Sequence, residues 1–146
     1  MNLKKQLKKG KYKSAKIKLL GSMHLSLKAK INGVPVVLLL DTGASNSCID
    51  LNAIESLKIK SKKSKMKAVG AGNSEIATKY SKKNELQIGG VKFRKIPLIL
   101  LDLSHVNGAL KQMNSGKVHG VLGADVLQDG KAIIDYNKFR LFLKEK

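Results

Sequence analysis

Residues 24–31, HLSLKAKI, alternate between polar and apolar side chains. This period of two is typical of a strand with one face in the core and the other in solvent. The dipeptide Asn32-Gly33 follows, and it is a strong signal for a tight hairpin. The returning segment, residues 34–40, is apolar on both faces, which predicts a strand in the interior of the fold. We expect this strand to end at Asp41.

The same pattern of short apolar segments and turn residues continues along the chain. We expect a short helix over 50–57 with Asp50 as its N-cap, hairpins over 65–80, 84–103 and 131–143, and a strand over 120–127 that stops at Gly123 and enters a short helix. Residues 104–114 fit either a loop or a helical turn. About nine short strands and at most two or three short helices indicate an all-β fold.

The length of 146 residues suits one domain. Residues 1–14 contain six lysines, no acidic residue and little apolar material, so we expect a basic flexible N-terminal tail. The folded domain is then expected to cover residues 15–146. A second basic segment, residues 58–67, is expected to form an exposed loop or the edge of a sheet.

The net charge of +19 comes from 29 basic and 10 acidic residues, and only Arg94 and Arg140 among the basic residues are arginines. Such a charge attracts nucleic acid non-specifically. Specific readers of phosphate and guanine usually rely on arginine, and aromatic residues that stack on bases make up only 4% here. We therefore expect a solvated lysine surface, with a basic nucleic-acid-associated protein as an alternative.

Cys48 is the single cysteine, so the chain cannot form an intrachain disulfide. The basic N-terminus is not followed by an apolar stretch of the signal-peptide type. The longest apolar run, residues 34–40, is too short to cross a bilayer. These features predict a cytoplasmic protein without a membrane partner.

Asp41 opens the sequence Asp-Thr-Gly at the end of the expected interior strand. One interpretation is a turn aspartate that accepts backbone hydrogen bonds. The other is a catalytic carboxylate held at the end of a rigid strand. The wholly apolar strand before it, the small residues after it and a second apolar segment ending at Gly123 favour the catalytic interpretation.

Three segments in this order resemble the retropepsin-like aspartic proteases. They are LLLDTGASNSCI (38–49) for the active-site strand and loop, KAVGAGNSEIA (67–77) for the flap hairpin, and GVLGADVL (120–127) for the strand, glycine and helix near the C-terminus. The resemblance covers roughly residues 23–143. It implies a closed β-barrel subunit with a flap hairpin and one or two short helices.

The resemblance also implies the reaction. Aspartic proteases place two carboxylates around one water; the pair shares a proton, so one group acts as base and the other as acid. The sequence contains a single Asp-Thr-Gly, and Asp102, which also ends an apolar run, is followed by Leu-Ser. A homodimer with one Asp41 from each chain is therefore expected to hydrolyse peptide bonds in a peptide or protein substrate, without a metal or organic cofactor.

Further site residues follow from the resemblance. Gly43 lets the backbone approach the carboxylate, and Thr42 supports its counterpart across the dimer interface, where its hydroxyl is expected to be buried and hydrogen-bonded. The expected substrate-binding residues are Ala44, Ser45, Cys48, Gly70, Ala71, Gly72, His119 and Val121. Each of three assignments has an alternative without a role in substrate binding. Cys48 could equally be an inert buried thiol, and His119 could be incidental to the site. Residues 70–73 could be the tip of a plain surface hairpin.

The sequence also departs from the viral members of the family. These often carry an arginine after the glycine equivalent to Gly123, paired with an acid in the active-site loop, whereas Ala124 and Ser45 occupy those positions. Asp125 is expected to cap a helix or to lie at the interface. The segment FRLFL at residues 139–143 could supply an interface strand. A binding module that keeps the fold and has lost activity is the remaining alternative, although the intact Asp-Thr-Gly argues against it.

Overall fold

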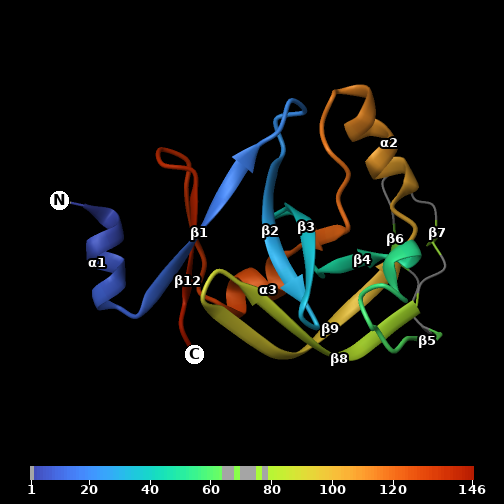
Figure 1. The fold of residues 1–146 in the computed structure, drawn as a ribbon, viewed down its shortest axis with the longest axis horizontal. Coiled ribbons are helices and arrows are strands. Elements are labelled where there is room, and N and C mark those ends of the chain that lie inside the picture. Colours follow the sequence, from blue (N-terminus) through green and yellow to red (C-terminus); the bar gives the residue numbers. More distant parts are fainter. Residues whose placement is uncertain (1, 64–67, 70–74, 77–78) are drawn as a thin grey trace.

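The computed structural model describes residues 2–63, 68–69, 75–76 and 79–146. Its centre is a closed barrel of six strands (Figure 1). Around the barrel these are β2 (Leu25–Ile31), β3 (Val34–Leu40), β10 (Gly120–Leu122), β4 (Cys48–Asp50), β9 (Val91–Leu101) and β8 (Lys79–Ile88). Pairing of β2 with β8 closes the barrel, which confirms the expected fold class.

The hairpin predicted at Asn32-Gly33 joins β2 to β3. Both residues have positive φ, 51° and 82°, as a tight hairpin turn of this kind requires. Strand β3 lies between β2 and β10, pairing antiparallel with the first and parallel with the second. The two-sided apolar character of β3 therefore reflects its interior position, as the sequence predicted.

Further strands extend the sheet beyond the barrel. Strand β1 (Tyr12–Leu19) pairs with β2 and with β12 (Arg140–Lys144), and β11 (Ile133–Asp135) pairs with the far side of β12. At the other end, β5 (Lys62–Lys63) is an edge strand on β8, which agrees with the sheet edge expected as one possibility for this basic segment. Strands β6 (Ala68–Val69) and β7 (Glu75–Ile76) pair with each other.

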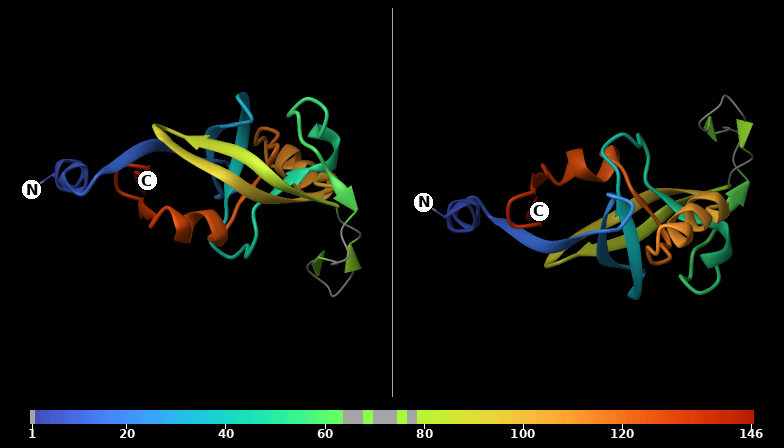
Figure 2. Two further views of the ribbon diagram at one scale, coloured as in Figure 1. Left: turned by 90° about the horizontal axis from the view of Figure 1, so that it is seen from below. Right: turned by 90° about the horizontal axis from the view of Figure 1, so that it is seen from above.

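The N-terminal segment differs from the expected flexible tail. Helix α1 (Leu3–Lys9) is capped by the side chain of Asn2, and β1 begins at Tyr12 with Tyr12 paired to Lys144. Strand β1 thus begins before residue 15, because strand β12, whose sequence position is remote, supplies backbone partners that local composition does not reveal. None of the described α1 residues is buried, so the helix lies on the surface (Figure 2).

Three further helical segments connect the strands. A 3₁₀ helix (Leu51–Ala53) replaces the longer helix expected over 50–57, with Asp50 at its N-cap as predicted. Residues 104–114, which the sequence left open, contain α2 (Ser104–Gln112). Helix α3 (Ala124–Asp129) follows Gly123, as expected. Within the described residues no helix combines the length and apolar character needed to span a membrane.

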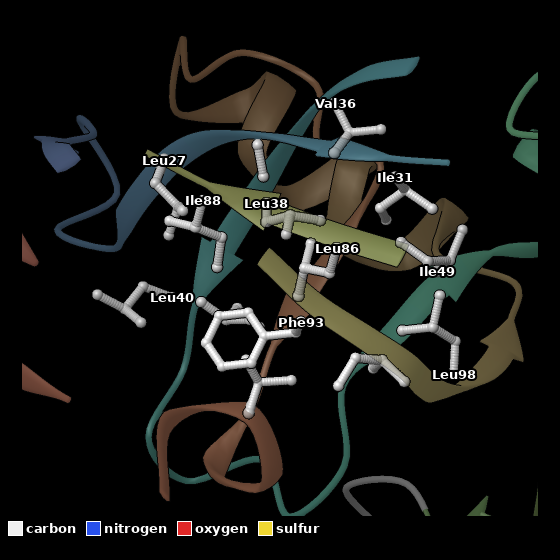
Figure 3. Close-up of a cluster of buried hydrophobic side chains, with 14 of the residues drawn as sticks. Leu27, Ile31, Val36, Leu38, Leu40, Ile49, Leu86, Ile88, Phe93 and Leu98 are labelled. Carbon is white, nitrogen blue, oxygen red and sulfur yellow. The ribbon is translucent and has the colours of Figure 1, made fainter. Parts of the chain in front are cut away.

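The barrel encloses an aliphatic core with one central aromatic ring, that of Phe93 (Figure 3). Phe93 is fully buried, and its neighbours in the core include Leu38 and Leu40 of β3. A smaller cluster lies on the opposite face of β3 and consists of Leu20, Leu39, Leu110 and Val118. Strand β3 is therefore packed on both faces, which makes it a rigid support for the residue at its end.

Candidate active site

Asp41 follows directly on β3. Its backbone N–H donates to the carbonyl of Leu122 at 3.0 Å, which continues the pairing of β3 with β10 by one residue. Its carboxylate oxygen Oδ1 accepts the backbone N–H of Gly43 at 2.9 Å. A Cβ on Gly43 would lie 3.3 Å from that same oxygen, so a side chain there would crowd the carboxylate. The Asp-Thr-Gly turn thus fixes the carboxylate through its own backbone.

Asp41, Thr42 and Gly43 are all exposed in the single chain. For Asp41 this exposure leaves the carboxylate accessible to water and to a substrate. For Thr42 it differs from the buried, hydrogen-bonded hydroxyl that the resemblance implied, because no other part of the described chain covers this turn. Burial of Thr42 consequently remains a prediction about a dimer.

The segment around Gly123 holds the active-site loop from behind. Ala124 donates its N–H to the carbonyl of Ala44 at 2.7 Å. A Cβ on Gly123 would lie 2.7 Å from the same carbonyl and 2.9 Å from the carbonyl carbon of Asn46. Only glycine permits this close approach, so two segments about eighty residues apart in sequence form one unit.

Ser47 and Asp125 complete this unit, and sequence reasoning did not select Ser47. The carboxylate of Asp125 accepts the backbone N–H of Ser47 at 3.0 Å from each oxygen, and the Ser47 hydroxyl at 2.7 Å. It also accepts the N–H of Val126 at 2.8 Å, and the Ser47 hydroxyl in turn accepts the N–H of Gly123 at 2.9 Å. Gly123 is the N-cap of α3, so Asp125 is not the helix cap that the sequence suggested; it lies in the first turn of the helix and fastens the active-site loop to it. Ser47 has no distinctive signal in the sequence.

Cys48 lies on β4 opposite Val121 of β10 and is buried. Burial raises the pKa of its thiol from 9.0 to about 11, and the nearby carboxylates of Asp125, Asp41 and Asp50 act in the same direction. A thiol with this pKa is neutral at physiological pH and is a poor nucleophile. Of the two interpretations of Cys48, the structure favours a packed and inert side chain in the wall behind the loop.

We expect Cys48 to react slowly with a thiol reagent such as dithionitrobenzoate at pH 8. A pKa of about 11 in place of 9.0 lowers the thiolate fraction roughly a hundredfold. The measurement compares the reaction rate of the folded protein with that of the same protein in denaturant. A folded-state rate equal to the denatured rate would contradict the buried, high-pKa thiol.

His119 is part of the barrel framework. Its ring nitrogen Nδ1 accepts the backbone N–H of Val37 at 3.0 Å, and the backbone N–H of His119 donates to the carbonyl of Val37 at 2.8 Å. Because a backbone N–H can only donate, Nδ1 carries no proton and the neutral ring holds its proton on Nε2. The carbonyl of His119 accepts the N–H of Asp50 at 2.8 Å. His119 thus joins β3, β10 and β4 beside the site, a role that spacing alone did not indicate.

The remaining expected substrate residues are placed as follows. Val121 is half-buried on β10 and packs against the smaller cluster on the outer side of β3. Ala44 is half-buried and Ser45 is exposed on the active-site loop. The flap-tip residues Gly70, Ala71 and Gly72 lie outside the described residues, whereas the two strands that flank them are paired.

Asp102, the rival carboxylate, serves a local purpose. Its oxygen Oδ1 accepts the N–H of Ser104 at 2.9 Å and also the Ser104 hydroxyl, at the start of α2. The hydrogen bond from the Ser104 hydroxyl, and to a smaller extent that from the Ser104 N–H, lowers the pKa of the exposed Asp102 carboxyl below 3.8. In the described part of the chain, no cluster of His, Cys, Asp and Glu side chains is arranged to hold a metal ion.

Comparisons with known proteins agree with this geometry. The family model described as aspartyl protease matches residues 27–126, and the chain belongs to this family. A comparison with curated protein sequences gives no match.

Among solved structures, a retropepsin-like aspartic protease from Rickettsia conorii has a TM-score of 0.58 at 20% identity, covering 92% of this chain and 90% of that one. EIAV protease in complex with the inhibitor HBY-793 has a TM-score of 0.57 at 21% identity, covering 75% of this chain and 90% of that one. The retroviral protease-like domain of Ddi1 from Leishmania major has a TM-score of 0.53 at 18% identity, covering 78% and 82%. At these identities the likeness establishes the retropepsin-like fold.

Proposed function

We propose that the protein is an aspartic endopeptidase that acts as a homodimer, with Asp41 of each subunit at one shared active site. In this site a water molecule lies between the two carboxylates, which share one proton because two like charges so close do not both ionise. The ionised carboxylate takes a proton from the water, and the protonated one donates to the carbonyl oxygen of the scissile peptide bond.

The observation that carries this proposal is the position of Asp41. An interior strand packed on both faces ends in a carboxylate that is exposed, held by the Gly43 N–H, and backed by the loop contacts of Gly123 and Asp125. A turn aspartate with a purely structural role would not need this support from segments remote in sequence. Rigid placement of a reacting group is what catalysis requires.

Substrate contacts follow from the same geometry. We propose that Ala44, Ser45 and Val121 line the cleft beside the reacting peptide bond. Cys48 and His119 shape the cleft from within the wall, the first as a small packed side chain and the second by fixing β3 against β10. Residues 70–72, between the paired strands β6 and β7, are proposed to close over the substrate as a flap and to exclude water.

The surface beside Thr42 supports the dimer. A hollow of about 310 Å³ adjoins Thr42 and is lined by residues of α3, of β11 and of the turn between them, including Leu127, Ala132 and Ile134. Strand β12 is paired on both sides, so FRLFL cannot offer a free edge, whereas β11 is the terminal strand of the sheet. A two-fold contact through this face would bring both Thr42 turns, and with them both Asp41 carboxylates, to the symmetry axis.

The proposal is tested by the mass of the protein in solution. We expect a native mass of about twice the 15.9 kDa chain, because one subunit supplies only half of the catalytic pair. Specific peptidase activity is expected to fall when the protein is diluted below the concentration at which light scattering shows dissociation. Full activity in a sample that is monomeric throughout would exclude the shared site.

A further inference from the structure

A second candidate binding site lies on the outer face of the sheet formed by β1, β2 and β3. It is a groove of about 630 Å³. The strand register pairs Lys18 with Ser26 and Lys28 with Val37, and all four residues line the groove. Successive residues of a strand point to opposite faces, so these side chains project away from the main core.

The floor of the groove is apolar. Leu20 and Val118 line it and belong to the smaller buried cluster, and the half-buried Val37 packs against that cluster. At one end the loop before β2 meets the loop after α2, where the N–H of Ser22 donates to the hydroxyl of Ser115 at 3.3 Å (Figure 1). The floor is therefore held between segments from three parts of the chain and does not depend on one mobile loop.

The walls of the groove are cationic. Lys16, Lys18, Lys28 and Lys117 line it, and no acidic residue is found among the lining residues that the structure describes. All four side chains are exposed, and in the described part of the chain none of them forms an ion pair with a carboxylate. An apolar floor between four unneutralised ammonium groups is complementary to a segment that carries both apolar and acidic side chains.

We propose that this groove binds a segment of the protein substrate that carries both acidic side chains and apolar side chains such as leucine. This segment lies at a distance from the peptide bond that is cut. The substrate role rests on the proposed peptidase function, whereas the binding itself does not. Val37 and Asp41 are four residues apart on the same side of one extended segment, which corresponds to about 13 Å. A substrate held in the groove is thus kept near the catalytic carboxylate without occupying it, and the local concentration of its cleavable part rises.

The proposal is tested by fluorescence anisotropy with a labelled peptide of about a dozen residues that alternates glutamate and leucine, at 0.15 M salt. The Asp41→Asn protein is used so that the probe stays intact. The first variant combines Lys16→Gln, Lys18→Gln, Lys28→Gln and Lys117→Gln. The matched control combines Lys5→Gln, Lys79→Gln, Lys83→Gln and Lys138→Gln, which removes the same charge from exposed positions elsewhere.

We expect the groove variant to bind the peptide roughly tenfold more weakly or worse, and the control to stay within about twofold of the parent protein. A second variant, Gly116→Glu, adds an acid to the groove at a position where a Cβ would meet no atom within 4 Å, so it is expected to weaken binding without disturbing the fold. Thermal unfolding of each variant is measured as a control for folding, and we expect the unfolding temperature to match that of the parent protein.

Three results would overturn the groove assignment. These are equal losses in the groove and control variants, equal binding of a peptide with serine in place of leucine, and equal binding of a single-stranded oligonucleotide of matched charge. The first two would show a general attraction to the lysine surface, and the third a site for polyanions. Tight, groove-dependent binding together with absent cleavage by the unsubstituted protein would contradict the peptidase function and still support the groove.

Discussion

Replacement of Asp41 by asparagine is expected to abolish peptide hydrolysis, with a loss of activity of about 10³-fold or more. An asparagine amide keeps the size of the side chain and can still accept the Gly43 N–H, so the turn should persist. It cannot take a proton from water or give one to a carbonyl oxygen, and acid–base catalysis of this kind contributes roughly 10²–10⁴-fold for a single group. In a symmetric dimer the substitution removes both groups at once.

The measurement is cleavage of a peptide library by the unsubstituted protein and the variant, followed by mass spectrometry. Asp102→Asn is the matched control, since Asp102 also follows an apolar strand and its carboxylate, among the described residues, bonds only to nearby Ser104. We expect the control to cut the same peptides at nearly the same rate. Identical cleavage patterns and rates for Asp41→Asn and the unsubstituted protein would rule out the carboxylate pair as the source of activity.

Replacement of Asp125 by alanine is expected to lower the free energy of unfolding by about 2–4 kcal/mol and to impair catalysis. The substitution removes the acceptor of the Ser47 N–H, the Ser47 hydroxyl and the Val126 N–H. Donors that lose a charged acceptor in a partly buried site cost more than an average hydrogen bond. Because Ser47 belongs to the active-site loop, its release should also displace Asp41, and a shift of about 1 Å can reduce the rate on the order of a hundredfold.

Denaturant unfolding and peptidase kinetics test this expectation together. Asp129→Ala is the matched control on the same helix, because Asp129 is exposed and, in the part of the chain that the structure describes, pairs with Lys146 alone. Such a surface pair contributes about 0–1 kcal/mol. Asp125→Asn keeps one acceptor oxygen, so we expect its free energy of unfolding to lie between those of the Asp125→Ala and Asp129→Ala proteins. Equal stability of the Asp125→Ala and Asp129→Ala proteins would show that the contact with Ser47 does not hold the loop.

Much of the fold is already predictable from local sequence patterns. The alternation of residues 24–31, the Asn32-Gly33 turn and the two-sided apolar strand after it are confirmed, as are the hairpin at Gly89-Gly90 and the strand and helix around Gly123. These elements depend on neighbours in the chain. Hydrophobic period and turn residues therefore suffice to indicate them.

The elements that were missed depend on remote partners. Strand β1 has mixed polarity and is set by pairing with β2 and β12, and the helix expected over 50–57 shortens to a 3₁₀ turn. The role of Ser47 shows the same limit at the site. A serine in a loop has no distinctive local signal, and only the fold brings it to Asp125 across 78 positions of sequence.

The sequence by itself determined the all-β class, the interior strand that ends in Asp41, and the strand, glycine and helix around Gly123, because each is encoded by neighbouring side chains. The tertiary structure alone decided which surfaces meet. It placed His119 in the framework, buried Cys48 so that the pKa of its thiol is raised, fastened the active-site loop through Asp125, and formed the lysine-walled groove from segments remote in sequence. Contacts between distant segments depend on how the strands are ordered around the barrel, and no local pattern of residues specifies that order.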